Sequence, residues 1–109
     1  MTSGRTPAGA GLLGLLGLGL RAGHLVVGVD GVRAALQGRQ VRCVVLARDA
    51  GPRAEEKVTR LATAQGIPVL AGPDAATLGD RLGRPPVQAV GVKDAALTDG
   101  LVRAAASGA

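Results

Sequence analysis

A chain of 109 residues has room for one domain with a single core, and its 47% hydrophobic content excludes an ordinary disordered chain. Phe, Tyr and Trp are all absent, which excludes recognition of single-stranded RNA by stacking its bases on aromatic rings. The 13 Lys and Arg residues outnumber 8 Asp and Glu residues, and the resulting formal charge of +5 favours an anionic partner.

The first apolar segment, residues 11–20, allows two interpretations. Its sequence GLLGLLGLGL lies between Arg5 and Arg21 and resembles a short secretory signal. It is too short to span a bilayer, because a transmembrane helix needs about 20 apolar residues. We favour a core helix with one leucine face, which Gly23 can end. The leucines on that face are Leu12, Leu13 and Leu16.

Beyond this helix the chain alternates short apolar runs with segments of helical periodicity. The first run predicts a strand over 25–27, followed by a helix that Asp30 caps and Gly38 ends. The run 41–47 is the strongest strand candidate and contains Cys43. Because the chain has one cysteine and so no disulfide partner for it, we expect Cys43 to be a reduced, buried thiol.

The second half of the chain repeats this alternation. Pro52 suits the first turn of a helix that ends at Gly66, and a strand is predicted over 67–70. Asp74 can cap a further helix, which Pro85 prevents from continuing. The last two predicted elements are a strand over 87–92 and a helix from Asp94. Four strands interleaved with about five helices predict an α/β protein, a three-layer α/β/α sandwich.

The reactive side chains do not suit an enzyme. The chain has one His, one Cys and 8 acidic residues, and the acids mostly occupy predicted helix starts. No Ser, Cys or acid stands at a telling spacing from His24, so we interpret it as a turn residue and not as a catalytic base. We therefore expect no catalytic residues, no metal and no cofactor.

Basic residues and glycines gather at three predicted loops at one end of the sheet, 28–33, 48–53 and 81–86. Backbone N–H groups at the helix start near Asp30 would face a phosphate, because a helix N-terminus carries partial positive charge. Asp49 is interpreted as a cap for the turn that follows it. The side chains expected to neutralise phosphates are Arg33, Arg48 and Arg84.

The order of these segments resembles the bacterial YlxQ-like members of the L7Ae ribosomal-protein family. The similarity covers residues 12 to about 103. It rests on the run LLGLGLRAGHLVVGVDGVRAALQGRQVRCVVLARDAGP, followed in order by AQGIPVL, LGDRLGRP and VGVKD. No piece is diagnostic alone, and the signal comes from their combination.

The resemblance implies a three-layer fold with a mixed four-stranded sheet, association with structured RNA, and no enzymatic activity. The best-known members of the family bind kink-turns. We therefore expect a cytoplasmic, bacterial, ribosome-associated or accessory protein that is a monomer and binds structured RNA, with ribosomal RNA as the favoured partner and neither DNA nor membrane. Residues 1–10 would form a flexible N-terminus and residues 11–106 a single RNA-binding domain.

In kink-turn binders the loop after the first strand reads Gly-x-Asn-Glu-x-x-Lys, and of this set only Gly28 is present. Asp30 can accept hydrogen bonds from guanine but cannot donate them as Asn does. Gly31 lacks the carboxylate and Ala34 lacks the amine, while Arg33 stands one position away, about 100° around the helix. We therefore expect recognition of RNA shape and phosphates in preference to kink-turn bases.

The resemblance also places two further loops at the RNA: one around Arg84, and the turn after the central strand around Asp49. The complete set of expected RNA-binding residues is Gly28, Val29, Asp30, Gly31, Arg33, Ala34, Arg48, Asp49, Arg84 and Pro85. Two alternatives stay open. One is a protein-interaction module that has lost its RNA site and binds through an apolar surface around Val29. The other is a secreted basic protein from which the first 22 residues are removed.

Overall fold

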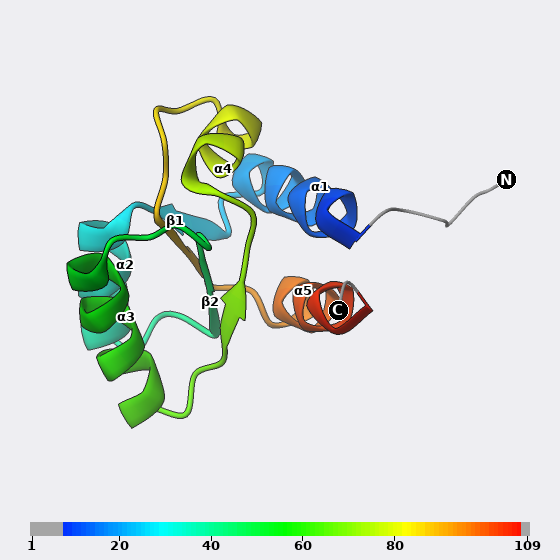
Figure 1. Cartoon of the computed structure of the whole chain (residues 1–109). Coiled ribbons are helices and arrows are strands. Elements are labelled where there is room, and N and C mark those ends of the chain that lie inside the picture. The colour runs from blue at the N-terminus through cyan, green and yellow to red at the C-terminus, as the bar shows by residue number, and fades with distance from the viewer. Residues whose placement is uncertain (1–7, 108–109) are drawn as a thin grey trace, which may run out of the picture.

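The computed structural model describes residues 8–107, in which nine helices and strands alternate along the chain (Figure 1). The number and order of these elements agree with the sequence-based prediction. The elements are α1 (Ala8–Arg21), β1 (Leu25–Val27), α2 (Val29–Gln37), β2 (Cys43–Leu46), α3 (Pro52–Ala64), β3 (Val69–Ala71), α4 (Ala75–Leu82), β4 (Ala89–Val92) and α5 (Ala95–Ser107).

The four strands form one mixed sheet in the order β1-β4-β2-β3. Strands β2 and β3 are parallel, with Val44 beside Val69, whereas β4 runs antiparallel to both of its neighbours. The ends of β1, β2 and β3 therefore lie at the same edge of the sheet as the start of β4. This arrangement confirms the mixed four-stranded sheet.

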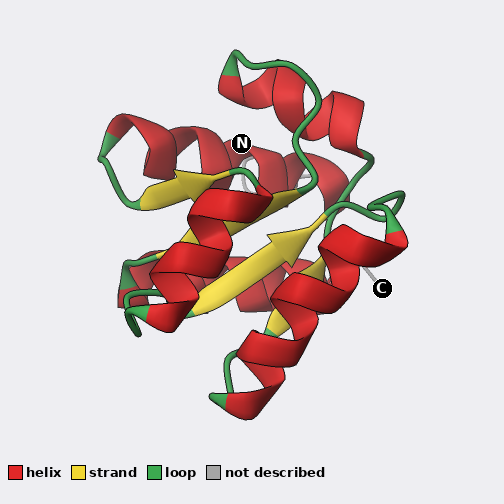
Figure 2. Cartoon of the chain, turned by 90° about the vertical axis from the view of Figure 1, so that its left-hand side faces the viewer, coloured by secondary structure: helices red, strands yellow, loops and turns green. Residues whose placement is uncertain are grey.

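Helices cover both faces of the sheet (Figures 1 and 2). Helices α2 and α3 pack on one face, and α1, α4 and α5 pack on the other. Successive residues of β2 point to opposite faces, so Cys43 and Val45 join one core cluster while Val44 and Leu46 join the other. This two-sided burial explains why β2 is apolar at every position.

Helix α1 is part of the core, as the leucine pattern predicts. Leu12 and Leu16 are buried, while Leu13 is half-buried against the same cluster. Gly19 lies so close to Leu97 of α5 that a Cβ at this position would collide with it. The helix is followed by Gly23, whose positive φ of 75° suits glycine. Within residues 8–107 no helix is both long enough and apolar enough to cross a membrane.

Several predicted boundaries differ from the structure. Residues 1–7 of the expected flexible N-terminus lie outside the described residues, and α1 begins at Ala8. The strands predicted over 41–47 and 87–92 are two residues shorter at their start, because Val41 and Val87 are buried beside the sheet and outside its ladder. The strand predicted over 67–70 is shifted to β3.

The prediction that Asp30 caps α2 is wrong. Helix α2 begins at Val29, and its N-cap is Gly28, whose φ of +99° is one that L side chains rarely adopt. The Gly28 carbonyl already accepts the first helical hydrogen bond, from the N–H of Val32 at 2.9 Å. Asp30 therefore lies inside the first turn, where its exposed carboxylate makes no capping bond.

Candidate nucleic-acid interface

Three loops meet at the sheet edge where β1 and β2 end and β4 begins. The N–H of Gly28 donates to the carbonyl of Ala89 at 2.9 Å, and the N–H of Ala47 donates to the carbonyl of Gln88 at 2.8 Å. The loops after β1 and β2 are thus both tied to the segment that leads into β4. We call this edge the rim and define it as residues 28–31, 47–53 and 83–88. It brings together the loops expected to bind RNA.

Two helices begin at the rim without a side-chain cap. Gly28 precedes α2 and Gly51 precedes α3, and neither residue has a side chain that could accept a hydrogen bond from the first turn. Helices α4 and α5 differ, because Asp74 and Asp94 accept such bonds at 2.7 and 2.8 Å. The partial positive charge at the starts of α2 and α3 therefore has no capping carboxylate.

An open pocket of about 490 Å³ lies between these two helix starts. It places the predicted residues Val29 and Asp30 next to Arg53 and Lys57 of α3. Arg53 ends the predicted loop 48–53 but was not among the expected RNA-binding residues, and Lys57 was not predicted at all. An alternation of strands and helices does not show which two helices lie side by side, so nothing local in the sequence connects α3 with α2. The complete lining is Val29, Asp30, Gly51, Pro52, Arg53, Ala54, Lys57 and Gln88.

Gln88 is a further residue that the sequence interpretation missed. Its Oε1 accepts a hydrogen bond from the N–H of Gly51 at 2.8 Å, so its side chain joins the loop before β4 to the start of α3. A glutamine amide keeps two N–H donors when its oxygen is engaged. Because Gln88 also lines the rim pocket, this amide can serve both as a structural link and as a donor to an anion.

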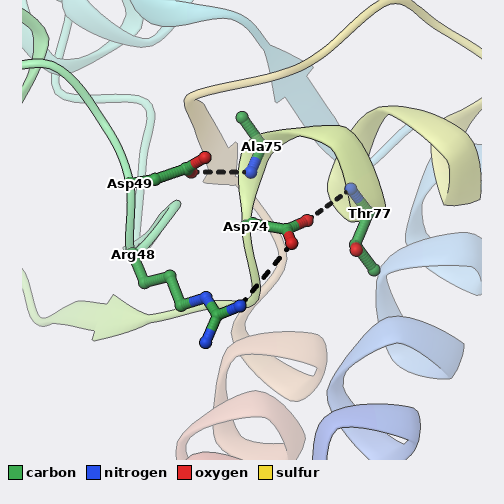
Figure 3. Close-up of polar contacts among 5 residues, drawn as sticks. All are labelled: Arg48, Asp49, Asp74, Ala75 and Thr77. Carbon is green, nitrogen blue, oxygen red and sulfur yellow. Dashed lines mark hydrogen bonds and ion pairs between the residues drawn. The ribbon is translucent and has the colours of Figure 1, made fainter.

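Polar contacts hold the loop after β2 against the start of α4 (Figure 3). One oxygen of Asp74 accepts a hydrogen bond from the N–H of Thr77 at 2.7 Å, and the other lies 3.6 Å from the Arg48 guanidinium. The hydrogen bonds from Thr77, with a smaller contribution from the Arg48 charge, hold the pKa of Asp74 below its ordinary value. Arg48 remains 72% exposed and can still meet solvent or an anion.

Asp49 contacts the start of α4 and not the turn that follows it in the sequence. Its Oδ1 accepts a hydrogen bond from the N–H of Ala75 at 2.8 Å, which satisfies the first residue of α4 (Figure 3). The prediction that Asp49 caps the turn following it is therefore wrong. The residue links two loops that are 26 positions apart in the sequence.

The other predicted residues have different exposures. Arg33 and Arg84 are exposed, and within residues 8–107 neither makes an ion pair. Ala34 is exposed on α2, whereas Gly31 lies against β1, where an added Cβ would meet Val26 at 3.0 Å. Pro85 is exposed in the loop before β4. Arg84 and Pro85 thus lie at the rim, while Arg33 and Ala34 lie further along α2.

The two remaining reactive side chains lie away from the rim. His24 is in the turn between α1 and β1, as predicted, with its Nε2 at 3.9 Å from a carboxylate oxygen of Asp94. Cys43 is buried, as predicted, and its burial raises the pKa of the thiol. Among the described residues no cluster of three or more potential metal ligands is present.

The layered fold and the rim define a class of small three-layer α/β/α proteins with loops gathered at one sheet edge. The chain belongs to the ribosomal protein L7Ae/L30e/S12e/Gadd45 family, whose model matches residues 12–101. This membership was expected from the resemblance.

Two solved structures are similar to this chain. A protein of unknown function from Bacillus halodurans shares 34% identity with a TM-score of 0.82, over 87% of this chain and 96% of that one. The Giardia lamblia 15.5kD RNA binding protein shares 15% identity with a TM-score of 0.78, over 98% of this chain and 92% of that one. At 15% identity the second similarity shows the fold alone. A comparison with curated proteins finds no match.

Proposed function

We propose that this protein binds structured RNA at the rim, mainly through backbone phosphates, and has no catalytic activity. The observation that carries the proposal is the convergence of two uncapped helix starts with exposed basic side chains at one sheet edge. Membership of the L7Ae/L30e/S12e/Gadd45 family supports RNA binding, and so does the shared fold of the Giardia RNA binding protein. The formal charge of +5 acts in the same direction.

Phosphate contacts are favoured over base contacts because the residues available at the rim suit them. Asp30, Gly31 and Ala34 replace the Asn, Glu and Lys of kink-turn binders, which removes the amide and the carboxylate that would read base edges, and the lysine amine with them. Uncapped helix N–H groups and arginines bind phosphates whatever the base sequence. Kink-turn RNA belongs to the proposed class of targets, but we propose that it would be recognised by its shape and not by its bases. The residues proposed to contact RNA are Gly28, Val29, Asp30, Gly31, Arg33, Ala34, Arg48, Asp49, Arg84 and Pro85.

The proposal extends to the biological setting. We place the protein among the bacterial YlxQ-like members of the family, as a cytoplasmic, monomeric, ribosome-associated or accessory factor with ribosomal RNA as its partner and not DNA. The 34% identity with the Bacillus halodurans protein supports a bacterial relationship. The ordered run of segments from Leu15 to Asp94 is the sequence feature that supports this subgroup.

A filter-binding titration against ribosomal RNA fragments tests the proposal. Three to five phosphate contacts would give a plot of log K against log salt a slope on the order of −2 to −4. Duplex DNA of the same length serves as the control, since weaker binding to it is expected for a protein fitted to RNA shape. Binding that is independent of salt, or no binding to any fragment, would contradict the proposal.

A protein-interaction module is the second candidate function. Its supporting observation is the loss of the Asn, Glu and Lys set at positions 30, 31 and 34, together with Val29 in the lining of the rim pocket. Purification after nuclease treatment separates the two candidates. A stoichiometric partner retained without RNA favours this module, whereas loss of all associated material with the RNA favours RNA binding.

A further inference from the structure

Helices α2 and α3 lie side by side on the outside of the sheet, and Figure 2 views this face. The side-chain amide of Gln65, just after α3, donates to the Leu36 carbonyl of α2 at 2.6 Å, which fixes one end of the helix pair. Between the helices runs a groove that we call the α2–α3 groove. Its lining is Arg33, Gln37, Glu56, Lys57, Arg60 and Leu61.

The side chains along this groove follow helical spacing. On α3, Arg53, Lys57 and Arg60 are separated by four and then three positions, so they form one stripe along the helix. On α2, Arg33 and Gln37 are four positions apart and line the facing wall. Polar and basic side chains of the two helices therefore line the two walls of the groove.

The groove is predominantly basic even though it contains carboxylates. The groove and the adjoining rim pocket are together lined by four cations and by two acids, Asp30 and Glu56. Glu56 lies 3.4 Å from Arg60, but both side chains are at least 70% exposed, so water and salt weaken this pair. An anion can therefore compete for Arg60. The four cations are Arg33, Arg53, Lys57 and Arg60.

The groove adjoins the rim. Lys57 lines both the rim pocket and the α2–α3 groove, so the two hollows meet at this residue. A polyanion held at the rim would meet the groove if it continued along α3. The groove floor is formed by half-buried Leu61, and no aromatic side chain exists in the chain to stack a base. These features suit the sugar-phosphate backbone of a nucleic acid and not an unpaired base.

We propose that the α2–α3 groove binds the phosphates of a helical RNA stem that extends from the segment held at the rim. The inference rests on the proposed RNA-binding function and adds a second surface to it. Double-stranded RNA is recognised through its shape, phosphates and 2′-hydroxyls. Arg33, Lys57 and Arg60 supply the charges, and the Gln37 amide supplies a donor and an acceptor for a 2′-hydroxyl.

The test compares two variants on two RNAs. The groove variant is Arg60→Ala, because Arg60 lines the α2–α3 groove but not the rim pocket and is not among the residues proposed above to contact RNA. The matched control is Arg103→Ala, which removes the same charge from an exposed position of α5 on the other face. Alanine favours helix at both positions, and circular dichroism checks the fold of each variant. The probes are an RNA hairpin with an internal loop and a full helical turn of flanking stem, and the same hairpin with that stem cut to a few base pairs.

The expected result is specific to the long stem. Loss of one phosphate contact makes the slope of log K against log salt shallower by about 0.7 to 0.9 for the groove variant on the long-stem RNA. The slope of the groove variant on the short-stem RNA should match the slope of wild type. The difference in slope between the two RNAs should be the same for the control variant as for wild type. If the wild type binds both hairpins and the slope of the groove variant on the long-stem RNA changes no more than the slope of the control, the groove does not bind RNA. The proposed function still stands in that case. If the wild type binds neither, both proposals fall.

Discussion

Asp49 and Asp74 come from different loops, and both stabilise the start of α4. Asp74 caps the helix locally, whereas Asp49 reaches the N–H of Ala75 from the loop after β2. The carbonyl of Ala75 in turn accepts a hydrogen bond from Val87 at 3.0 Å, so one residue joins three segments of the rim region. Individual carboxylates therefore help to set where the basic loops lie.

Replacing Asp49 by alanine should lower the free energy of unfolding by about 0.5–2 kcal/mol, because the first N–H of α4 loses its acceptor. Urea denaturation of wild type and variant measures the difference. Asp49→Asn is the matched control, since its amide oxygen can still accept the bond and most of the stability should return. Equal stability of wild type and Asp49→Ala would show that water replaces the carboxylate at no cost.

The stability contributed by Asp74 should depend on pH. Its hydrogen bonds with Thr77 lower the pKa of the folded state, while the unfolded chain keeps the ordinary value of about 3.9. The contribution is therefore fully present above pH 3.9 and is lost as the pH falls through the folded-state pKa. Asp74→Asn should flatten the acid limb of a plot of unfolding free energy against pH. An acid limb as steep in the variant as in wild type would contradict this prediction.

At the scale of elements, helix α4 and the loop that follows it are packed backbone against backbone. A Cβ added at Gly79 would collide with the carbonyl of Pro85 and lie 2.8 Å from that of Arg84. The N–H of Arg84 donates to the Gly79 carbonyl at 2.9 Å, which holds the loop in this close approach. The position of Arg84 at the rim thus depends on a glycine one turn earlier.

Gly79→Ala should therefore destabilise the protein by about 1–3 kcal/mol, the usual cost of overpacking, because the obstructing atoms are backbone. Gly14→Ala in α1 is the matched control: nothing lies within 4 Å of its added Cβ, so the better helix propensity of alanine should stabilise by about 0.5–1 kcal/mol. Thermal denaturation measures both. A Gly79→Ala variant as stable as wild type would mean that the loop moves away without cost.

Gln88 connects the loop before β4 to the start of α3, and Gln88→Glu should separate its two roles. The carboxylate can still accept the bond from the Gly51 N–H, so the melting temperature should change little. Its negative charge in the rim pocket should weaken RNA binding severalfold, with the larger effect at low salt. Filter binding at two salt concentrations measures this effect. Unchanged affinity would place the bound RNA away from the pocket.

For the molecule as a whole, the sequence predicted the class of fold because each element carries a strong local pattern. The apolar run of β2 follows from burial of the strand on both faces of the sheet. The single apolar stripe of α3 follows from burial of the helix on one side only. The order of strands could not be predicted, because nothing local shows that β4 lies between β1 and β2. The contacts of Asp49 and Gln88 join residues 26 and 37 positions apart, so no sequence pattern marks them.

The same limit applies to the candidate site. The loops around Gly28, Arg48 and Arg84 were predicted to share one end of the sheet, since strand ends that alternate with helices meet there. The structure brings these loops together at the rim. The contribution of Arg53 and Lys57 depends on how α3 packs beside α2, which is a tertiary property. The loops that form the rim could therefore be predicted from the sequence, whereas the groove between α2 and α3 could not.

A formal charge of +5 attracts RNA from a distance wherever the charges lie, so the final prediction separates net charge from the rim. Arg84→Ala and Arg103→Ala remove the same charge from exposed positions, one at the rim and one on α5. If Arg84 contacts a phosphate, its loss should make the salt slope of RNA binding shallower by about 0.7–0.9, equally for RNAs of different sequence. Arg103→Ala should leave the slope near wild type, because a charge that touches no phosphate releases no counterion. Equal changes in both variants would mean that overall charge, and not the loops at the sheet edge, holds the RNA.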